Sequence, residues 1–505
     1  MKQLKSLTTV AAILLVLPAI AFAMADLVVA TDAPPKAMNP HAFSSDANLS
    51  YMSNFFDGLL QRKAPEGKLG PALAVKWARV DGLTWRFELR KGVTFHNGNA
   101  FTAADVKFTF ERMKDPKYST LLNIANSIES IETPDDYTVI FKTKKPVPWF
   151  AETMHQNFIV DMESSAKRDD GDYNTRPIGT GAYKLVEWVK GSYVRMEANP
   201  NYWEGKPKYN QVDIRPIVEE ATRFAALAGK QVDIVNGVPV TLFDRIQKMP
   251  HVDIISRPAR RCIYMDISNK PDTPFADIRV RKAIAHAINE EEIIEKVMRG
   301  QATLAHQIPD VPTVGYDASI KRLPYDPAMA KKLLADAGYP DGFAIDVVGP
   351  NDRYVNDEKI CEAVAKYLAK VGLKVNLDVK PKSIFFDELS EYKHRFYLIG
   401  WFDGSFDFGR SAEKLLHTPD KDKGMGAYNG TIYSNADLDA KIIASSSILD
   451  RGEREKALQA INRESVEDVA WIPLHYQQDI FAVVKGKNIK FTPRSDRWIV
   501  AKEIQ

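Results

Sequence analysis

Two different periods of apolar residues follow one another between residues 71 and 116. In the first, apolar side chains alternate with charged ones, and the apolar positions are Trp85, Phe87 and Leu89. A period of two predicts a half-buried strand. In the second, apolar side chains recur on one helical face, at Val106, Phe110 and Met113. Because Thr102 and Asp105 have the spacing of a capping pair, this stretch predicts a strand followed by a capped helix.

The first half of the chain continues with a mixture of short strands and helices. Residues 26–32 have an apolar centre that predicts a buried strand, and residues 137–142 predict another strand. Residues 49–60 are typical of a short helix. Residues 219–228 also predict a helix, which Gly229 ends and a strand follows. A helix that leads into a strand is the unit of an α/β lobe.

The second half is more strongly helical. We expect helices to begin at Asp277, Asn289 and Asp326, because each has the side chain of an N-cap residue. Residues 373–379 alternate in hydrophobicity and residues 396–402 are apolar, so both predict strands. These elements indicate a second α/β lobe. The composition changes between residues 263 and 269, and we place the crossing from the first lobe to the second there.

The N-terminal residues have the pattern of an export signal. Lys2 and Lys5 precede an apolar run over residues 10–22, and Ala21-Phe22-Ala23 offers a small-residue cleavage site. A membrane anchor is disfavoured because the run is short and contains Pro18. No cysteine at the cleavage site offers a thiol for lipidation. The sequence therefore predicts a signal peptide over residues 1–23 and a soluble periplasmic protein.

The net charge and the cysteine content limit the possible partners and disulfides of the protein. The chain has 68 basic and 66 acidic residues, and residues 1–23 contain two lysines and no acid, which leaves 66 of each sign in the mature chain. Because no basic excess remains, a nucleic-acid partner is not expected. Cys262 and Cys361 would meet an oxidising compartment and could pair, although their spacing carries no geometric information.

Motifs for catalysis are missing from the sequence. It contains no G-x-S-x-G, H-E-x-x-H, G-x-x-x-x-G-K-[ST] or C-x-x-C pattern, and the nine histidines are scattered. We therefore predict that the protein is not an enzyme and has no catalytic residue, metal or cofactor. A secreted hydrolase of peptides or sugars is the rival hypothesis, and it would be distinguished by turnover of its ligand.

The stretch 77–106 resembles the signature of the family 5 extracellular solute-binding proteins, which are the dipeptide, oligopeptide and nickel receptors of ABC importers. The shared features are Trp77, a D-G turn, an F-x-L-R strand, a G-V-x-F-H-x-G turn and an F-T-A-x-D-V helix. Residues 177–183 (PIGTGAY) resemble a second segment of the family, P-x-G-T-G-x-Y. The similarity extends over nearly the whole mature chain.

This resemblance implies a periplasmic binding protein-like α/β fold, with two α/β lobes joined by a two-crossing hinge and an additional N-terminal α+β subdomain. The expected layout has four parts: signal peptide 1–23; lobe I from 24–48, 176–263 and 477–505; inserted subdomain 49–175; and lobe II 264–476, in which residues 471–476 form the return crossing. It also implies a monomer that delivers a small solute to an ABC permease with its ATPase subunits. No ATP chemistry is expected on this chain.

The resemblance implies a ligand site as well. In peptide-binding relatives an aspartate shortly after a G-W pair takes the ligand's amino group, and the match here is Gly400-Trp401 with Asp403. Asp403 stands two positions after the tryptophan, where peptide receptors usually have three, so Asp407 is the alternative. Arg353 lies two positions from the arginine that takes the carboxylate in dipeptide binders, and a guanidinium fork suits that group.

Two further groups of side chains are candidates for the pocket. Trp401, Tyr428, His475 and Tyr476 are expected to wall it. Arg257, Arg260 and Arg261 form a basic cluster before the hinge that would either meet an anionic ligand or line a solvated edge. A short peptide is the leading ligand, because a zwitterion accounts for one acid and one arginine across a cleft. A nickel chelate, haem, an oligosaccharide and an opine-like compound remain open.

Overall fold

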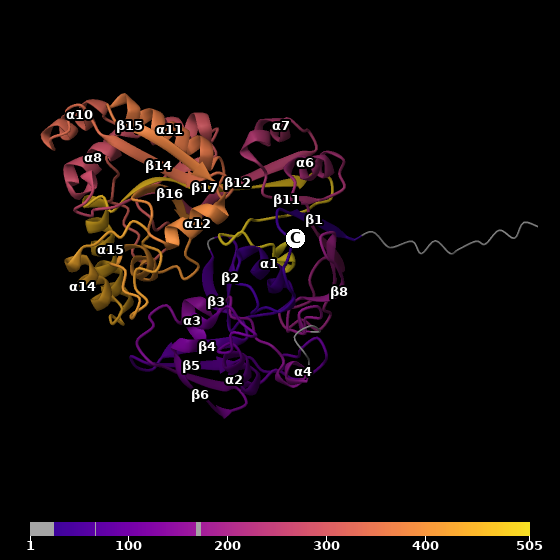
Figure 1. Ribbon diagram of the computed structural model, residues 1–505. Coiled ribbons are helices and arrows are strands. Elements are labelled where there is room, and N and C mark those ends of the chain that lie inside the picture. The colour runs from indigo at the N-terminus through magenta and orange to yellow at the C-terminus, as the bar shows by residue number, and fades with distance from the viewer. Residues whose placement is uncertain (1–24, 66, 168–172) are drawn as a thin grey trace, which may run out of the picture.

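The computed structural model describes residues 25–65, 67–167 and 173–505. Figure 1 shows two bodies side by side at the top of the molecule, and a third that lies below and between them. The predicted signal peptide, residues 1–23, lies outside the described residues. Among the residues that are described, no helix is long and apolar enough to cross a membrane.

One 11-stranded sheet runs through both upper bodies, in the order β15-β14-β16-β12-β17-β11-β1-β10-β9-β8, with β13 paired to β17. Its lobe I strands are β1 (Leu27–Thr31), β8 (Tyr183–Val189), β9 (Tyr193–Ala198), β10 (Gln211–Pro216) and β11 (Ile234–Asn236). Its lobe II strands are β13 (Ala302–Leu304), β14 (Ala344–Pro350), β15 (Lys374–Lys380) and β16 (Phe396–Trp401). Strand β1 is parallel to β10 and β11, and β14 is parallel to β15 and β16.

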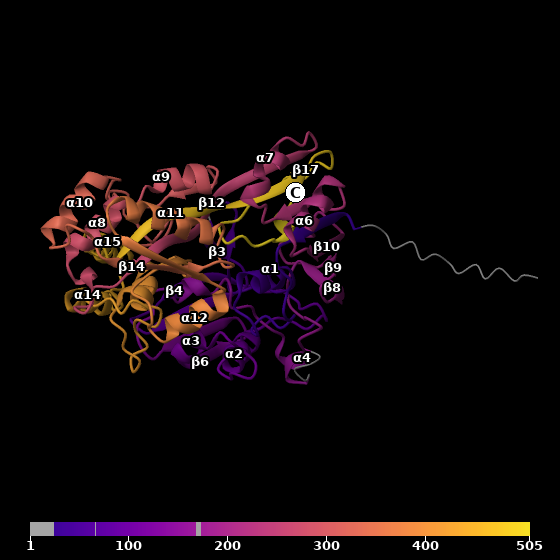
Figure 2. The same ribbon diagram turned by 45° about the horizontal axis from the view of Figure 1, so that its top comes forward.

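Two long antiparallel strands connect the lobes: β12 (Val252–Ile267) and β17 (Trp471–Val484). Val252 pairs with Val484 at the lobe I end, and Asp266 pairs with Trp471 at the lobe II end. The register shifts between Pro258 and Cys262, which makes an irregularity in the middle of the ladder. Both strands pass from one body to the other in Figure 2. The crossings predicted near residues 263–269 and 471–476 therefore fall on continuous strands.

Lobe II carries most of the helices, as its sequence predicts. They are α8 (Ile278–Ala287), α9 (Glu290–Glu292), α10 (Pro327–Asp336), α11 (Asp357–Lys370), α12 (Lys382–Ser390), α13 (Phe408–Ser411), α14 (Ala436–Ser445) and α15 (Arg451–Glu467), with π-helical turns η4 (Ile293–Val297) and η5 (Ala412–Leu416). Asp277, Asn289 and Asp326 each accept a hydrogen bond from a backbone N–H of the first helical turn. Since these bonds satisfy otherwise unpaired N–H groups, all three predicted N-caps are confirmed.

The lower body contains the signature stretch. Its four-stranded sheet has the order β4-β5-β7-β6, with β4 (Ala74–Arg79), β5 (Thr84–Leu89), β6 (Ile128–Asp135) and β7 (Thr138–Thr143). The other elements are the ribbon β2 (Leu60–Lys63) and β3 (Lys68–Pro71), and the helices α2 (Ala103–Arg112), α3 (Leu122–Ser127) and α4 (Met162–Ala166). Thr102 and Asp105 form the predicted capping box of α2. Phe87, Phe110 and Phe141 pack together in the core below it.

Helix α1 (Asp46–Phe55) differs from its predicted range of 49–60. It starts earlier because the Ser45 side chain caps it, and Phe56 is already extended. Its apolar residues pack into the core of lobe I, together with Leu27 and Ile214. We therefore place the start of the inserted subdomain after α1 rather than at residue 49.

The remaining helices of lobe I are α6 (Glu220–Ala228) and α7 (Phe243–Gln247), and the short 3-10 turns of the chain are η1 (Ala151–Thr153), η2 (Val240–Leu242), η3 (Pro274–Ala276) and η6 (Ala501–Glu503). The C-terminal residues 498–504 return to the lobe I core. Cys262 and Cys361 are both buried and free, so they do not form the disulfide that the sequence left open.

Candidate ligand-binding cleft

A cavity of about 990 Å³ lies between the two lobes. Lobe I contributes residues that follow β1, the start of α1 and the C-terminal segment around Trp498. Lobe II contributes the loop after β14, the start of α12 and the end of β16. The cavity therefore lies beyond the carboxyl ends of strands from both lobes, which is where ligands bind in open α/β sheets. Its volume is within the range of small-molecule sites.

An aromatic pair forms part of the lobe II wall. The rings of Trp401 and Tyr428 are 5.6 Å apart at an interplanar angle of 49°. The Trp401 Nε1–H donates to the Ser411 hydroxyl at 2.9 Å, which fixes the indole at the end of β16. Tyr428 is 59% exposed, so its ring is available to a ligand. Both residues line the cavity, and their contact with a ligand stays a prediction.

The cleft is also lined by charged side chains, most of which are already paired. Arg497 lies 2.8 Å from Asp479 and 3.3 Å from Asp32. Lys382 lies 3.7 Å from Asp352. Asp496 accepts two hydrogen bonds from Arg494, at 2.9 Å and 2.6 Å. These pairs hold the rim in place but offer little free charge to a solute.

Three lining residues have no ion pair or side-chain hydrogen bond within the described ranges: Asp46, Arg261 and Arg353. Burial raises the pKa of Asp46, while Arg261, Arg497 and Arg353 oppose that shift. Burial likewise lowers the pKa of Arg261. Each of these two groups influences the pKa of the other, and no hydrogen bond or ion pair joins them, so opposite charges line the same cavity.

The two candidate aspartates are not available to a ligand amine. Asp403 is buried, and its carboxylate accepts hydrogen bonds from the Ser405 N–H at 2.7 Å, from Arg410 at 3.1 Å and from Ser411 at 3.1 Å. It therefore braces the loop after β16 and does not line the cavity. Asp407 is bound by Arg454 through two hydrogen bonds. Neither agrees with the predicted role, because each carboxylate is already satisfied inside lobe II.

The two β17 residues expected in the wall are buried elsewhere. His475 is fully buried, and its Nδ1 lies 2.6 Å from Glu290 Oε1. The Tyr476 hydroxyl donates to the carbonyls of Gln307 and Pro309. Successive residues of β17 are buried over this stretch, so its side chains pack in the cores on the two faces of the sheet and not against the cleft. His475 and Tyr476 are corrected to core residues.

The basic cluster before the hinge separates into three different environments. Arg257 donates to the carbonyls of Pro65 and Pro493. Arg260 pairs with Asp310 at 3.0 Å. Arg261, on the same strand, points to the cleft. Asp46 was not predicted at all, because an acid in the first turn of a helix has an ordinary local explanation and carries no sequence signal for ligand binding.

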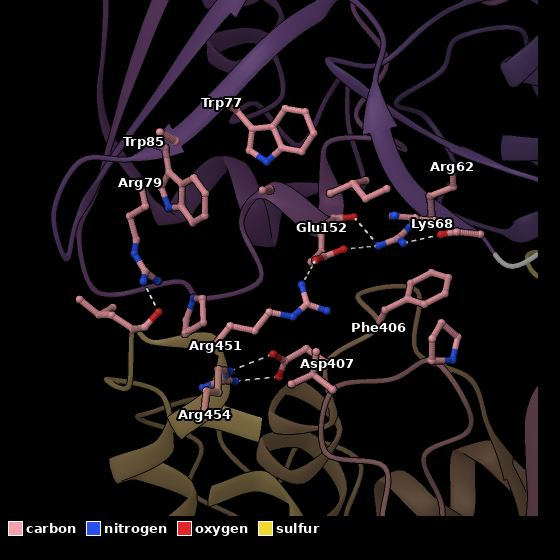
Figure 3. A pocket seen from close by; sticks show the side chains of 18 residues that line it. Arg62, Lys68, Trp77, Arg79, Trp85, Glu152, Phe406, Asp407, Arg451 and Arg454 are labelled. Atoms are coloured by element: carbon pink, nitrogen blue, oxygen red, sulfur yellow. Dashed lines mark hydrogen bonds and ion pairs between the residues drawn. The ribbon is translucent and has the colours of Figure 1, made fainter. Parts of the chain in front are cut away.

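A second cavity, of about 770 Å³, lies between the inserted subdomain and lobe II (Figure 3). Most of its cationic side chains are already engaged: Arg62 with Glu152, Arg79 with the Leu449 carbonyl, and Arg454 with Asp407. Arg451 reaches Glu152 across the interface at 3.7 Å. The Arg79–Leu449 and Arg451–Glu152 contacts connect the subdomain to lobe II, so this cavity belongs to the contact between the two bodies. The described residues hold no cluster of three or more metal-binding side chains.

Comparison with known proteins defines the class. The model of the bacterial extracellular solute-binding proteins, family 5, matches residues 68–423. The glutathione-binding protein GsiB of Pectobacterium atrosepticum is 27% identical over 463 residues, which are 89% of this chain and 88% of that protein. The Heme-binding protein A of Haemophilus influenzae is 27% identical over 450 residues, with 83% and 81% covered.

Solved structures show the same fold. HbpA2 from Haemophilus parasuis superposes with a TM-score of 0.85 at 22% identity, covering 95% of this chain and 99% of that one. The periplasmic binding protein DppA from Helicobacter pylori, in complex with the peptide STSA, has a TM-score of 0.75 at 24% identity, with 95% and 97% covered.

Fold, cleft and comparisons together define a two-lobed solute-binding protein. The chain belongs to the family 5 bacterial extracellular solute-binding proteins. This membership confirms the predicted family and fold class, and the predicted role as the binding component of an ABC importer rather than an enzyme.

Proposed function

We propose that the protein captures a short peptide between its lobes and delivers it to a membrane permease. The observation that carries this proposal is the unpaired Asp46 of lobe I, which faces the unpaired Arg261 and Arg353 on the other side of the cleft. A free peptide carries an ammonium and a carboxylate, so it complements both signs at once. The aromatic wall of Trp401 and Tyr428 would exclude water and strengthen those contacts.

The lining of the cleft favours a peptide over the other solutes considered. Its described residues include no histidine, cysteine or methionine, which are common ligands of nickel and of haem iron. Two relatives carry names that fit a peptide, since GsiB is a glutathione-binding protein and DppA was solved with a bound peptide. We further propose that residues 1–23 are removed on export and that the mature protein acts in the periplasm as a monomer.

The test is isothermal titration of protein that has been unfolded, stripped of ligand and refolded. Di- to pentapeptide pools should give saturable heat, and the peptide should be recovered unchanged afterwards. Absence of binding to every pool would reject the peptide assignment while leaving the solute-binding fold in place. Recovery of cleaved peptide would favour the rival hypothesis of a hydrolase.

A further inference from the structure

The charged side chains that line the cleft are not all paired within the protein. The lining contains eight charged residues: Asp32, Asp46, Asp352, Asp496, Arg261, Arg353, Lys382 and Arg497. Five of them already have partners of opposite charge: Asp32, Asp352, Asp496, Lys382 and Arg497. One acid and two arginines remain within the described part of the chain. The groups left for a ligand therefore carry one negative and two positive charges.

The two arginines are held near each other by one aromatic ring. The guanidinium carbon of Arg353 lies 5.2 Å from the centroid of the Tyr354 ring, and that of Arg261 lies 6.0 Å from it. The Tyr354 hydroxyl donates to the Gly400 carbonyl at 3.3 Å, which fixes the ring at the end of β16. Burial lowers the pKa of Arg261, and the like charge of Arg353 acts in the same direction. Such a pair is favourable only when anions join it.

Asp46 provides the opposite charge from lobe I. It is the first residue of α1, but the hydrogen bond that caps this helix comes from Ser45. Its carboxylate therefore makes no capping hydrogen bond, and Asp46 lines the cavity. Both free arginines act on it electrostatically from the other side. An ammonium placed beside Asp46 would replace the interactions with water that the carboxylate has lost.

We propose that the ligand is a small peptide with one ammonium and two carboxylates, and hence a net charge of −1. This inference rests on the proposed peptide-binding function and specifies its ligand class. Asp46 takes the ammonium, while Arg261 and Arg353 each take a carboxylate. A neutral zwitterionic peptide would leave one guanidinium group without an anion in the closed cleft, which is costly. A peptide with one glutamyl or aspartyl residue has the required set of groups.

Matched peptide pairs test this assignment by isothermal titration. The first pair is Ala-Glu-Ala and Ala-Gln-Ala, which differ by one carboxylate at nearly constant shape. The second pair is glutathione and its monoethyl ester, which places the second carboxylate on a γ-linked backbone. In at least one pair, the acidic member should bind about 30-fold more tightly or better. Equal or tighter binding of the neutral member in both pairs would overturn the inference but leave the peptide-binding function standing.

If none of the four probes binds, the proposed preference for a peptide of net charge −1 is rejected. The peptide pools then decide whether the proposed peptide-binding function fails with it.

Three variants test which side chain binds which charged group of the peptide. Arg261→Gln and Arg353→Gln should each reduce the acidic-to-neutral affinity ratio toward one. Asp46→Asn should weaken the free tripeptide about 30-fold but leave its N-acetyl analogue unchanged.

Arg299→Gln is the matched control, because this arginine lies outside the cleft lining and pairs with Asp244 at 3.6 Å. It should leave the affinity ratio unchanged. Thermal melts should show that the three test variants remain folded. If Arg261→Gln and Arg353→Gln lower the affinity of both members of a pair equally, the two arginines have only a structural role and the inference is wrong.

Discussion

The carboxylate of Asp407 and the guanidinium group of Arg454 form a buried bidentate pair, with hydrogen bonds of 2.7 Å and 2.8 Å. Asp407 caps α13 through the Gly409 N–H, and Arg454 belongs to α15. The pair therefore ties two helices of lobe II together. Both side chains are nearly inaccessible to solvent. This acid stabilises the lobe, although its position in the sequence is equally compatible with a ligand contact.

Replacing Asp407 by asparagine should destabilise the protein and change ligand affinity little. The variant leaves the Arg454 charge buried without its partner, a change that costs about 3 kcal/mol or more. Urea unfolding followed by circular dichroism would measure this loss. Glu129→Gln is the control, because the Glu129–Lys142 pair is exposed and its loss should cost about 0.5 kcal/mol or less. A folded Asp407→Asn variant of wild-type stability that no longer binds peptide would restore Asp407 as a ligand residue.

Acid should destabilise the fold through His155. Burial lowers the pKa of this side chain to about 3, and the nearby Arg62 and Arg494 act in the same direction. Its ring packs on Trp498, and its Nδ1 lies 2.8 Å from the Glu152 carbonyl. Below an ordinary histidine pKa of 6.5 the unfolded chain takes up a proton that the folded chain does not. Stability from this group is therefore complete above about pH 6.5 and is lost as the pH falls toward 3.

Between pH 7 and pH 5, the free energy of unfolding should fall by about 2 kcal/mol less in the His155→Gln variant than in the wild type. Guanidinium unfolding at both pH values gives this difference. His286→Gln serves as the control, since its ring lies near the surface and contacts the Pro324 carbonyl. Asp266, whose pKa burial raises to about 7, acts in the opposite direction but is common to all three proteins. Identical pH dependence in the wild type and His155→Gln would contradict the assignment.

The two cysteines should be unreactive in the folded protein. Cys262 and Cys361 are both fully buried, and burial raises the pKa of each thiol. The thiolate is the reactive species, so these side chains are protected both because they are buried and because they stay protonated. Treatment with iodoacetamide should leave the native mass unchanged and add two adducts after unfolding in guanidinium. A protein that gains no adduct after unfolding without reductant would instead contain the disulfide.

Local patterns were sufficient for much of the fold. The capping box of Thr102 and Asp105, the N-caps at Asp277 and Asp326, and the alternating strand around Phe87 each depend on residues within a few positions of one another. Such features follow from hydrophobic period and from the N–H groups at a helix start. The family signature added the order of the lobes, which no local pattern contains.

The ligand site was predicted less well because its members are selected by distant partners. His475 pairs with Glu290, which is 185 positions away in the sequence, and Asp407 pairs with Arg454, which is 47 positions away. In contrast, Asp46 faces the cleft because no such partner reaches it within the described residues. A sequence shows which side chains are charged but not which charges are already neutralised. Trp401 and Arg353 line the cavity because the ends of β16 and β14 lead to it, and Tyr428 reaches it from the loop between η5 and α14.

Closure of the lobes should depend on Phe406. Its ring lies 3.6 Å from the guanidinium carbon of Arg62, on β2, and 3.5 Å from that of Arg260, on β12. Figure 3 shows Phe406 and Arg62 facing each other across the gap between lobe II and the inserted subdomain. The contact with Arg62 exists only while the two bodies are together. Its cation–π energy therefore stabilises the closed state over the open one.

The Phe406→Leu variant keeps an apolar side chain but removes the aromatic face. Peptide affinity should fall about tenfold, because part of the binding energy is then used to close the lobes. At a peptide concentration that just saturates the wild type, small-angle scattering should give a larger radius of gyration for the variant, because less of the variant is bound and closed. Phe224→Leu is the matched control, since Phe224 contacts Arg245 at 4.5 Å entirely within lobe I and its loss leaves closure unaffected. Equal affinity and equal scattering for Phe406→Leu and the wild type would show that this contact follows closure without contributing to it.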